Sequence, residues 1–105
     1  MMKISIAKDF SRYPSGRFMK NGDTSGEAFR EKHLLAPLLA GESVTVELDG
    51  TIGYGSSFLE EAFGGVARKL KLTSQVLFEK ITLVSSDKLL IEEIKQYIRD
   101  ASKVS

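Results

Sequence analysis

Apolar residues follow two different periods along this chain. They alternate with polar residues over residues 3–7, 43–49 and 80–85, a period of two that predicts strands. They recur every three or four residues in 24–41, 57–70 and 86–102, which predicts amphipathic helices. The clearest helical stripe lies in the second of these segments and consists of Leu59, Ala62, Phe63, Val66, Ala67 and Leu70.

A further extended piece is expected at residues 17–20, between turn-forming residues at 14–16 and 21–23. We interpret it as a hairpin or an arm folded onto a sheet edge. Residues 76–78 form a short apolar piece that leads into the last strand. Strands that alternate with helices argue for an α/β fold: a small sandwich with a mixed, mostly parallel sheet of about four strands and three helices. The polar alternation in 43–49 leaves one sheet face only partly covered.

The helix boundaries also carry signals. Thr24 with Glu27, and Ser57 with Glu60, have the spacing of a capping box. Residues 86–87 are expected to cap the third helix.

Glycines mark two further points. Gly41 is expected to stop the first helix. Residues 64–65, both glycine, interrupt the second helix, either to let its backbone approach the sheet or as a flexible point in a conformational switch.

Composition excludes several kinds of chemistry. The 105 residues suffice for one domain, which we assign to 1–105, and contain no cysteine and one histidine. Disulfides, thiolate zinc sites, thiol nucleophiles and centres with two histidines are therefore ruled out, and we expect neither metal nor cofactor. No secretory or membrane-spanning stretch is visible, so we expect a cytoplasmic protein whose residues 103–105 fray.

Charge is nearly balanced overall but segregated along the chain. The formal net charge of +1 provides no overall attraction to nucleic acid or membrane. Residues 1–23 and 68–105 each carry net +3, whereas residues 24–67 carry net −5. Such a distribution suits a particular protein partner.

The loop at residues 50–57 is the main candidate for function. It joins a strand to a helix at the carboxyl edge of the sheet, where open α/β sheets bind their ligands. It has neither the Gly-Lys-Ser/Thr ending of a Walker A loop nor the spacing of a dinucleotide site. If Ser57 caps the helix, Ser56 is left for phosphorylation; alternatively, both serines only cap. No nucleophile elbow accompanies Ser56, and we expect no enzymatic activity.

A basic arm precedes the first helix. Arg12, Arg17 and Lys20 are interleaved with Tyr13 and Phe18, a pattern suited to an acidic or phosphorylated protein surface or to a solvated edge. Three cations are too few for strong binding to nucleic acid.

Two other titratable features have plain structural interpretations. The adjacent Glu60 and Glu61 are typical of a first helical turn that compensates the helix dipole. His33 is expected to be a partly exposed helix residue.

Residues 12–68 contain a set of motifs that resembles a known family. The motifs are RYPSGR at 12–17, TSGE at 24–27 with FR at 29–30, and LDG at 48–50 continuing to GYGSSFLEEAFGG at 53–65. They are similar to those of the STAS-like domain family of unknown function, which is related to the bacterial anti-anti-sigma STAS domains. The resemblance implies a STAS-like sandwich in a bacterial regulatory protein.

The resemblance also implies a switch. By position, Ser56 corresponds to the phospho-acceptor and Ser57 to the following serine. The implied partner is a GHKL-type ATPase or kinase. This chain departs from the STAS pattern at Gly55, where an aspartate is usual, and at Phe58, where a small residue is common.

These observations lead to one hypothesis and one alternative. The hypothesis is a non-enzymatic regulatory module that docks a protein partner through the glycine-rich loop and the following helix, with oligomeric state left open. The alternative is a small-ligand or nucleotide sensor that uses the same loop with Arg12 and Arg17. Besides the two serines, the candidate binding residues are Arg12, Arg17, Asp49, Gly53, Tyr54, Gly55, Phe58, Glu60 and Glu61.

Overall fold

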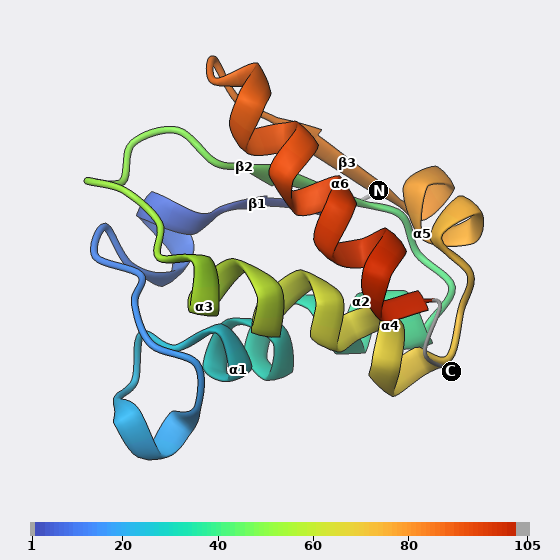
Figure 1. The fold of residues 1–105 in the computed structure, drawn as a ribbon, viewed down its shortest axis with the longest axis horizontal. Helices are drawn as coiled ribbons and strands as arrows, with labels where there is room; N and C mark the ends of the chain where they lie inside the picture. Colours follow the sequence, from blue (N-terminus) through green and yellow to red (C-terminus); the bar gives the residue numbers. More distant parts are fainter. Residues whose placement is uncertain (1, 103–105) are drawn as a thin grey trace.

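A computed structural model describes residues 2–102 (Figure 1). The expectation that residues 103–105 fray concerns residues outside this range. The strands are β1 (Met2–Ser5), β2 (Val44–Glu47) and β3 (Ile81–Val84). The helical elements are η1 (Ile6–Phe10), η2 (Met19–Asn21), α1 (Gly26–Phe29), η3 (Arg30–Leu34), α2 (Leu35–Leu39), α3 (Ser56–Leu59), η4 (Glu60–Gly64), α4 (Gly65–Leu70), α5 (Ser74–Lys80) and α6 (Lys88–Ser102).

Two of the predicted helices are continuous but contain a π-helical turn. Residues 26–39 run through α1, η3 and α2, and residues 56–70 run through α3, η4 and α4. We call them the first and second helical segments. The predicted stop at Gly41 is confirmed, because this residue has a φ of +82° directly after the first segment.

The three strands form a parallel sheet in the order β1-β2-β3. Ile4, Val46 and Leu83 lie side by side on the face that packs against the helices. Figure 1 shows α1 to α4 on one side of the sheet. The expected partly covered face is present: Lys3, Thr45 and Thr82 share the other face, where Lys3 and Thr82 are exposed and Thr45 is partly buried. The mixed α/β class is thus confirmed.

The predicted fourth strand, at residues 17–20, is wrong. This segment contains the 3₁₀ turn η2 instead. The carbonyl groups of Gly16 and Arg17 accept hydrogen bonds from the amides of Gly26 and Glu27, each at 3.0 Å. These amides belong to the first turn of a helix and have no partner within it. The arm therefore provides hydrogen-bond acceptors for the first amides of the first helical segment and does not extend the sheet.

The prediction of three helices missed α5 and η1. Thr73 caps α5, its Oγ1 accepting from the amide of Val76 at 3.3 Å, so residues 76–78 are helical. The first strand ends at Ser5, two residues earlier than predicted. There the amide of Ser5 donates to Asp9 at 2.7 Å and the Ser5 hydroxyl accepts from Lys8, which closes the turn η1.

Both predicted capping boxes are wrong as well. Ser25, not Thr24, caps the first helical segment and accepts from Ala28 at 3.1 Å. Gly55 occupies the N-cap of the second segment, which has no side-chain cap. The third cap is confirmed, because Asp87 accepts from the amides of Leu89 and Leu90 at 3.0 and 3.2 Å.

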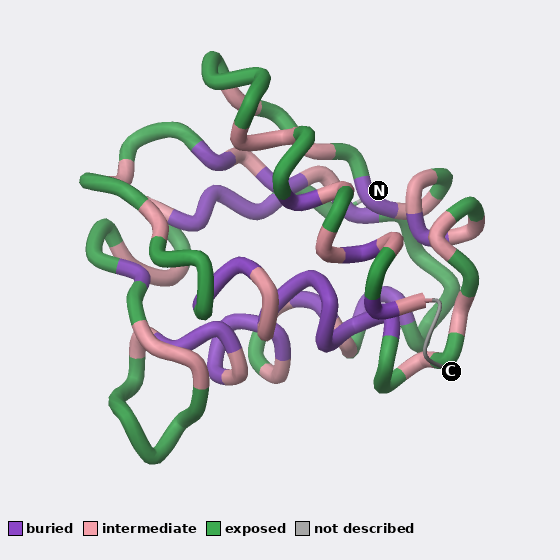
Figure 2. The backbone as a smooth tube through the Cα atoms, in the orientation of Figure 1, coloured by how far each residue is buried: buried purple, intermediate pink, exposed green. Residues whose placement is uncertain are grey.

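The second helical segment is the centre of the core. Its predicted apolar stripe is fully buried except for Leu70, which is partly buried (Figure 2). The residues at 64–65 do not approach the sheet. Gly64 instead lies near the backbone of Tyr97 in α6, and Gly65 lies against the side chain of Arg30.

None of the helices in residues 2–102 has the length and apolar character needed to cross a bilayer.

Candidate functional site

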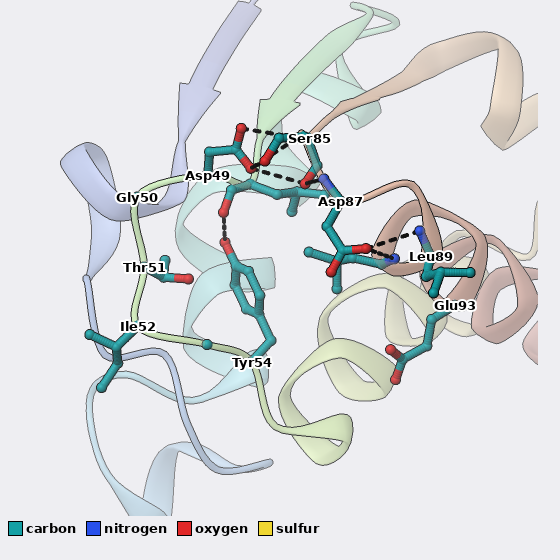
Figure 3. A pocket seen from close by; sticks show the side chains of 13 residues that line it. Asp49, Gly50, Thr51, Ile52, Tyr54, Ser85, Asp87, Leu89 and Glu93 are labelled. Atoms are coloured by element: carbon teal, nitrogen blue, oxygen red, sulfur yellow. Dashed lines mark hydrogen bonds between the residues drawn. The ribbon is translucent and has the colours of Figure 1, made fainter.

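An open groove of about 590 Å³ lies at the carboxyl edge of the sheet. One wall is the loop that follows β2, from Asp49 to Tyr54, and the other is the turn and first part of α6, from Ser85 to Glu93 (Figure 3). The groove lies where the parallel strands end, as the topology predicts. Its lining includes the carboxylates of Asp49, Asp87 and Glu93 and contains no basic side chain.

Asp49 joins the two walls of the groove. Its Oδ1 accepts from the hydroxyl of Ser85 at 3.0 Å and from that of Ser86 at 3.2 Å, and its Oδ2 accepts from the Ser86 amide at 3.0 Å. The Asp49 carboxylate is thus a structural acceptor that fixes the end of β2 to the β3–α6 turn.

Tyr54 holds the loop against the sheet. Its hydroxyl donates to the carbonyl of Leu48 at 2.6 Å, and the ring points back toward the end of β2 (Figure 3). Burial raises the pKa of Tyr54, and the nearby Asp49 adds to the increase, so the phenol stays neutral and keeps donating. Gly53 and Gly55 on either side are exposed, and Ile52 is 73% exposed.

The two candidate serines are both exposed at the first turn of the second helical segment. Because Gly55 is the N-cap, neither hydroxyl is needed there as a cap. From the sequence, only Ser56 was expected to have a hydroxyl that does not cap the helix. In the structure this is also true of Ser57.

Phe58 does not belong to the accessible surface. It is fully buried and packs against Phe10, Phe29 and Tyr54, with ring centroids 5.9–6.2 Å apart. Our expectation that Phe58 contacts a partner directly is therefore wrong. The ring fills the space beneath the loop and supports Tyr54 from inside.

Glu60 and Glu61 pair with arginines from three parts of the chain. Arg17 in the arm donates to Oε1 of Glu60 and lies 3.3 Å from Oε1 of Glu61. Arg68 donates to Oε2 of Glu60 at 2.6 Å. Hydrogen bonds from Arg68 and then Arg17 lower the pKa of Glu60, although burial opposes this shift. The arm and the helix start, both predicted to contact a partner, thus bind one another.

Arg30 is the buried member of this network. Its side chain is 4% exposed, and its Nη1 donates to the carboxylate of Glu61 at 2.6 Å and to the Glu61 carbonyl at 2.9 Å. Burial alone would lower the pKa of Arg30, but hydrogen bonds to Glu61 and Glu31 outweigh it and raise the pKa.

Arg12 lies apart from the network. Its side chain is exposed, and its carbonyl accepts from the amide of Ile52 at 3.0 Å. This bond places the start of the arm, including Arg12, beside the loop. Arg12 therefore lies at the loop, whereas Arg17 pairs with Glu60 and Glu61.

Three site residues were missed by sequence reasoning: Ser85, Ser86 and Arg30. The serines follow a strand directly, and a polar pair at a strand's carboxyl end is a signal that could have been used. Arg30 belongs to the motif residues that carry the family resemblance, but helical spacing alone does not distinguish a buried arginine from an exposed one. In the described part of the chain, no three acidic or histidine side chains are arranged to hold a metal ion.

The architecture and the position of the groove define a small α/β domain with a parallel sheet and a candidate site at its carboxyl edge. The family model of the STAS-like domain of unknown function matches residues 25–89, well over half of the chain. The protein therefore belongs to this family. No significant match was found among curated proteins or among solved structures.

Proposed function

We propose that this domain is a non-enzymatic regulatory module that docks a protein partner through residues 50–55 and the first turn of the second helical segment. The observation that carries the proposal is the exposure of Ser56 and Ser57 at a helix start that neither of them caps. A phosphate there is favoured by the helix dipole and adds a charge of about −1.5 to −2 to the docking surface.

The partner we propose is a GHKL-type ATPase or kinase, which family resemblance favours. Such an enzyme would phosphorylate Ser56 and thereby lose affinity for the domain. The neighbouring Glu60 and Glu61 are held by arginines, so a new phosphate would change the local charge on a fixed surface rather than rearrange it.

The alternative, a nucleotide sensor, has less support. Asp49, Asp87 and Glu93 line the groove, where they would repel phosphates, and Arg17 is already engaged by Glu60 and Glu61. We therefore expect no increase in melting temperature with nucleotides, since a ligand stabilises a protein only by binding its native state.

The experiment combines the protein with ATP and a GHKL-type ATPase. Phosphate is located by mass spectrometry, and binding is measured by calorimetry. We expect modification at Ser56, its loss in Ser56→Ala and its retention in Ser43→Ala, which alters an exposed serine far from the loop. Ser56→Glu should weaken docking about tenfold, or 1.4 kcal/mol. If no complex forms and no phosphate is found at Ser56 or Ser57, the proposal is wrong.

A further inference from the structure

The free edge of β3 lies outside the surface discussed so far. Among the described strands, β3 pairs only with β2, and it lies at the margin of the sheet in Figure 1. The carbonyl of Val84 accepts from the amide of Leu48 at 2.8 Å, so the backbone of Val84 faces β2. In a parallel ladder alternate residues face opposite sides, and the N–H and C=O groups of Leu83 therefore point to the open edge.

This edge lacks the features that usually prevent strand pairing. Proteins protect exposed edges with charged side chains or proline, and the sequence of β3, ITLV, contains neither. The opposite edge of the sheet differs, because β1 carries the exposed cation of Lys3. The free edge of β3 can thus accept another strand.

A groove of about 250 Å³ runs beside this edge, between β3 and α6. Its apolar floor includes Phe78, Leu83 and Ile91, all partly buried. Two cations border it: Lys95 Nζ lies 5.9 Å and Arg99 Cζ lies 5.3 Å from the centroid of the Phe78 ring. No carboxylate lines the groove. Lys95 Nζ lies 3.9 Å from the exposed carboxylate of Glu92, one turn away on α6, whereas Arg99 makes no ion pair within residues 2–102.

We propose that an extended acidic segment of a partner protein adds to β3 as a fourth strand. Its backbone hydrogen-bonds to Leu83, an apolar side chain enters the groove, and a carboxylate lies near Lys95 and Arg99. Main-chain bonds provide affinity in this mode of recognition, and alternate side chains provide specificity. A second copy of this chain fits less well, because its β1 would bring Lys3 and its β3 another Lys95 and Arg99 toward the same cations.

The test is an NMR titration of the full chain with capped peptides of about seven residues, a usual strand length, in which valine alternates with glutamate. We expect amide shifts at residues 81–85 and none in the loop at 50–55. Affinity should fall about tenfold when lysine replaces glutamate, and also when the amides that would face Leu83 are N-methylated. Lys95→Glu combined with Arg99→Glu should weaken binding similarly. The matched control, Lys32→Glu with Lys71→Glu, reverses two exposed cations elsewhere and should bind as wild type does.

Several results would overturn the proposal. These are no shift at 81–85 at millimolar peptide, equal binding of the lysine peptide, or indifference to N-methylation. The free protein could also sediment as a dimer. If charge reversal at residues 95 and 99 does not weaken that dimer, a second copy of the chain is the occupant instead. Because the loop at 50–55 takes no part in this test, its outcome is independent of the function proposed above.

Discussion

Arg30 occupies the space that a side chain at position 65 would need. A Cβ built on Gly65 would overlap Nη1 of Arg30 and lie 3.2 Å from its Cδ. The same Nη1 donates to Glu61, so this guanidinium cannot move aside without breaking a buried ion pair. The glycine therefore allows an arginine of the first helical segment to pass over the second and reach the turn that follows the candidate serines.

Gly65→Ala should destabilise the protein by about 1–3 kcal/mol. The free-energy cost of overpacking this buried position outweighs the roughly 1 kcal/mol by which alanine favours a helix over glycine. Urea denaturation measures this change. Gly55→Ala is the control for an added Cβ, since a Cβ there meets nothing within 4 Å, and it should cost at most about 1 kcal/mol, because an N-cap prefers glycine to alanine. In an Arg30→Met background Gly65→Ala should cost less. A Gly65→Ala protein as stable as wild type would show that the contact is easily relieved.

Periodicity was sufficient to predict the α/β class, the buried stripe of the second helical segment and the strand at 81–84. It could not predict how polar groups would be used. The fourth strand failed because Gly16 and Arg17 direct their carbonyls to the amides of a helix start. That choice depends on a tertiary contact that local pattern does not contain.

The candidate site shows the same limit. The position of the glycine-rich loop followed from topology, and the exposure of Ser56 followed from its place at a helix start. The burial of Phe58 and of Arg30 did not follow, because each depends on a partner from another helix: the ring of Phe29 and the carboxylate of Glu61. Charge and hydropathy alone placed Phe58 on the surface and did not reveal that Arg30 is buried.

Tyr54→Phe should loosen the loop. Losing the hydrogen bond to the Leu48 carbonyl should cost about 1 kcal/mol and speed amide exchange at residues 50–54. The variant also tests pH dependence. Because the folded pKa of Tyr54 is raised above its ordinary 10.0, the corresponding stability is present below 10.0 and lost as pH rises from there through the folded pKa.

Denaturation across that range should therefore show an alkaline loss of stability that is smaller in Tyr54→Phe than in wild type. Tyr13→Phe alters a ring that is 60% exposed and should behave as wild type does. Identical alkaline profiles for wild type and Tyr54→Phe would contradict the role assigned to the buried phenol.

His33 should make the protein less stable in mild acid. Its ring packs against Phe10 and Phe29, with ring centroids 5.8 and 5.6 Å away, and burial lowers its pKa from 6.5 although Asp9 opposes the shift. The unfolded chain therefore takes up a proton first, and stability is present above 6.5 and lost as pH falls through the folded pKa. Urea denaturation from about pH 7 to 5 should show this loss in wild type and not in His33→Gln. An equal decline in both proteins would assign it to other groups.

The pairing of Arg17 with Glu60 should control how firmly the arm is held. Arg17→Met should raise the exchange rates of the Gly26 and Glu27 amides, which donate to the carbonyls of Gly16 and Arg17, by about tenfold if the pair contributes about 1.4 kcal/mol. Arg12→Met removes the arm's other arginine, which is exposed, and should leave these rates unchanged.

Acid should release the arm in the same way. The pKa of Glu60 is lowered below 4.5 by its bonds from Arg68 and Arg17, so its contribution to stability is present above that pH and lost as pH falls through the folded value. The protection of the Gly26 and Glu27 amides should then fall with pH in wild type and be low at every pH in Glu60→Gln. Protection that stays high in Glu60→Gln would show that the backbone bonds alone hold the arm, and that the ion pair only neutralises the charge beside the serines.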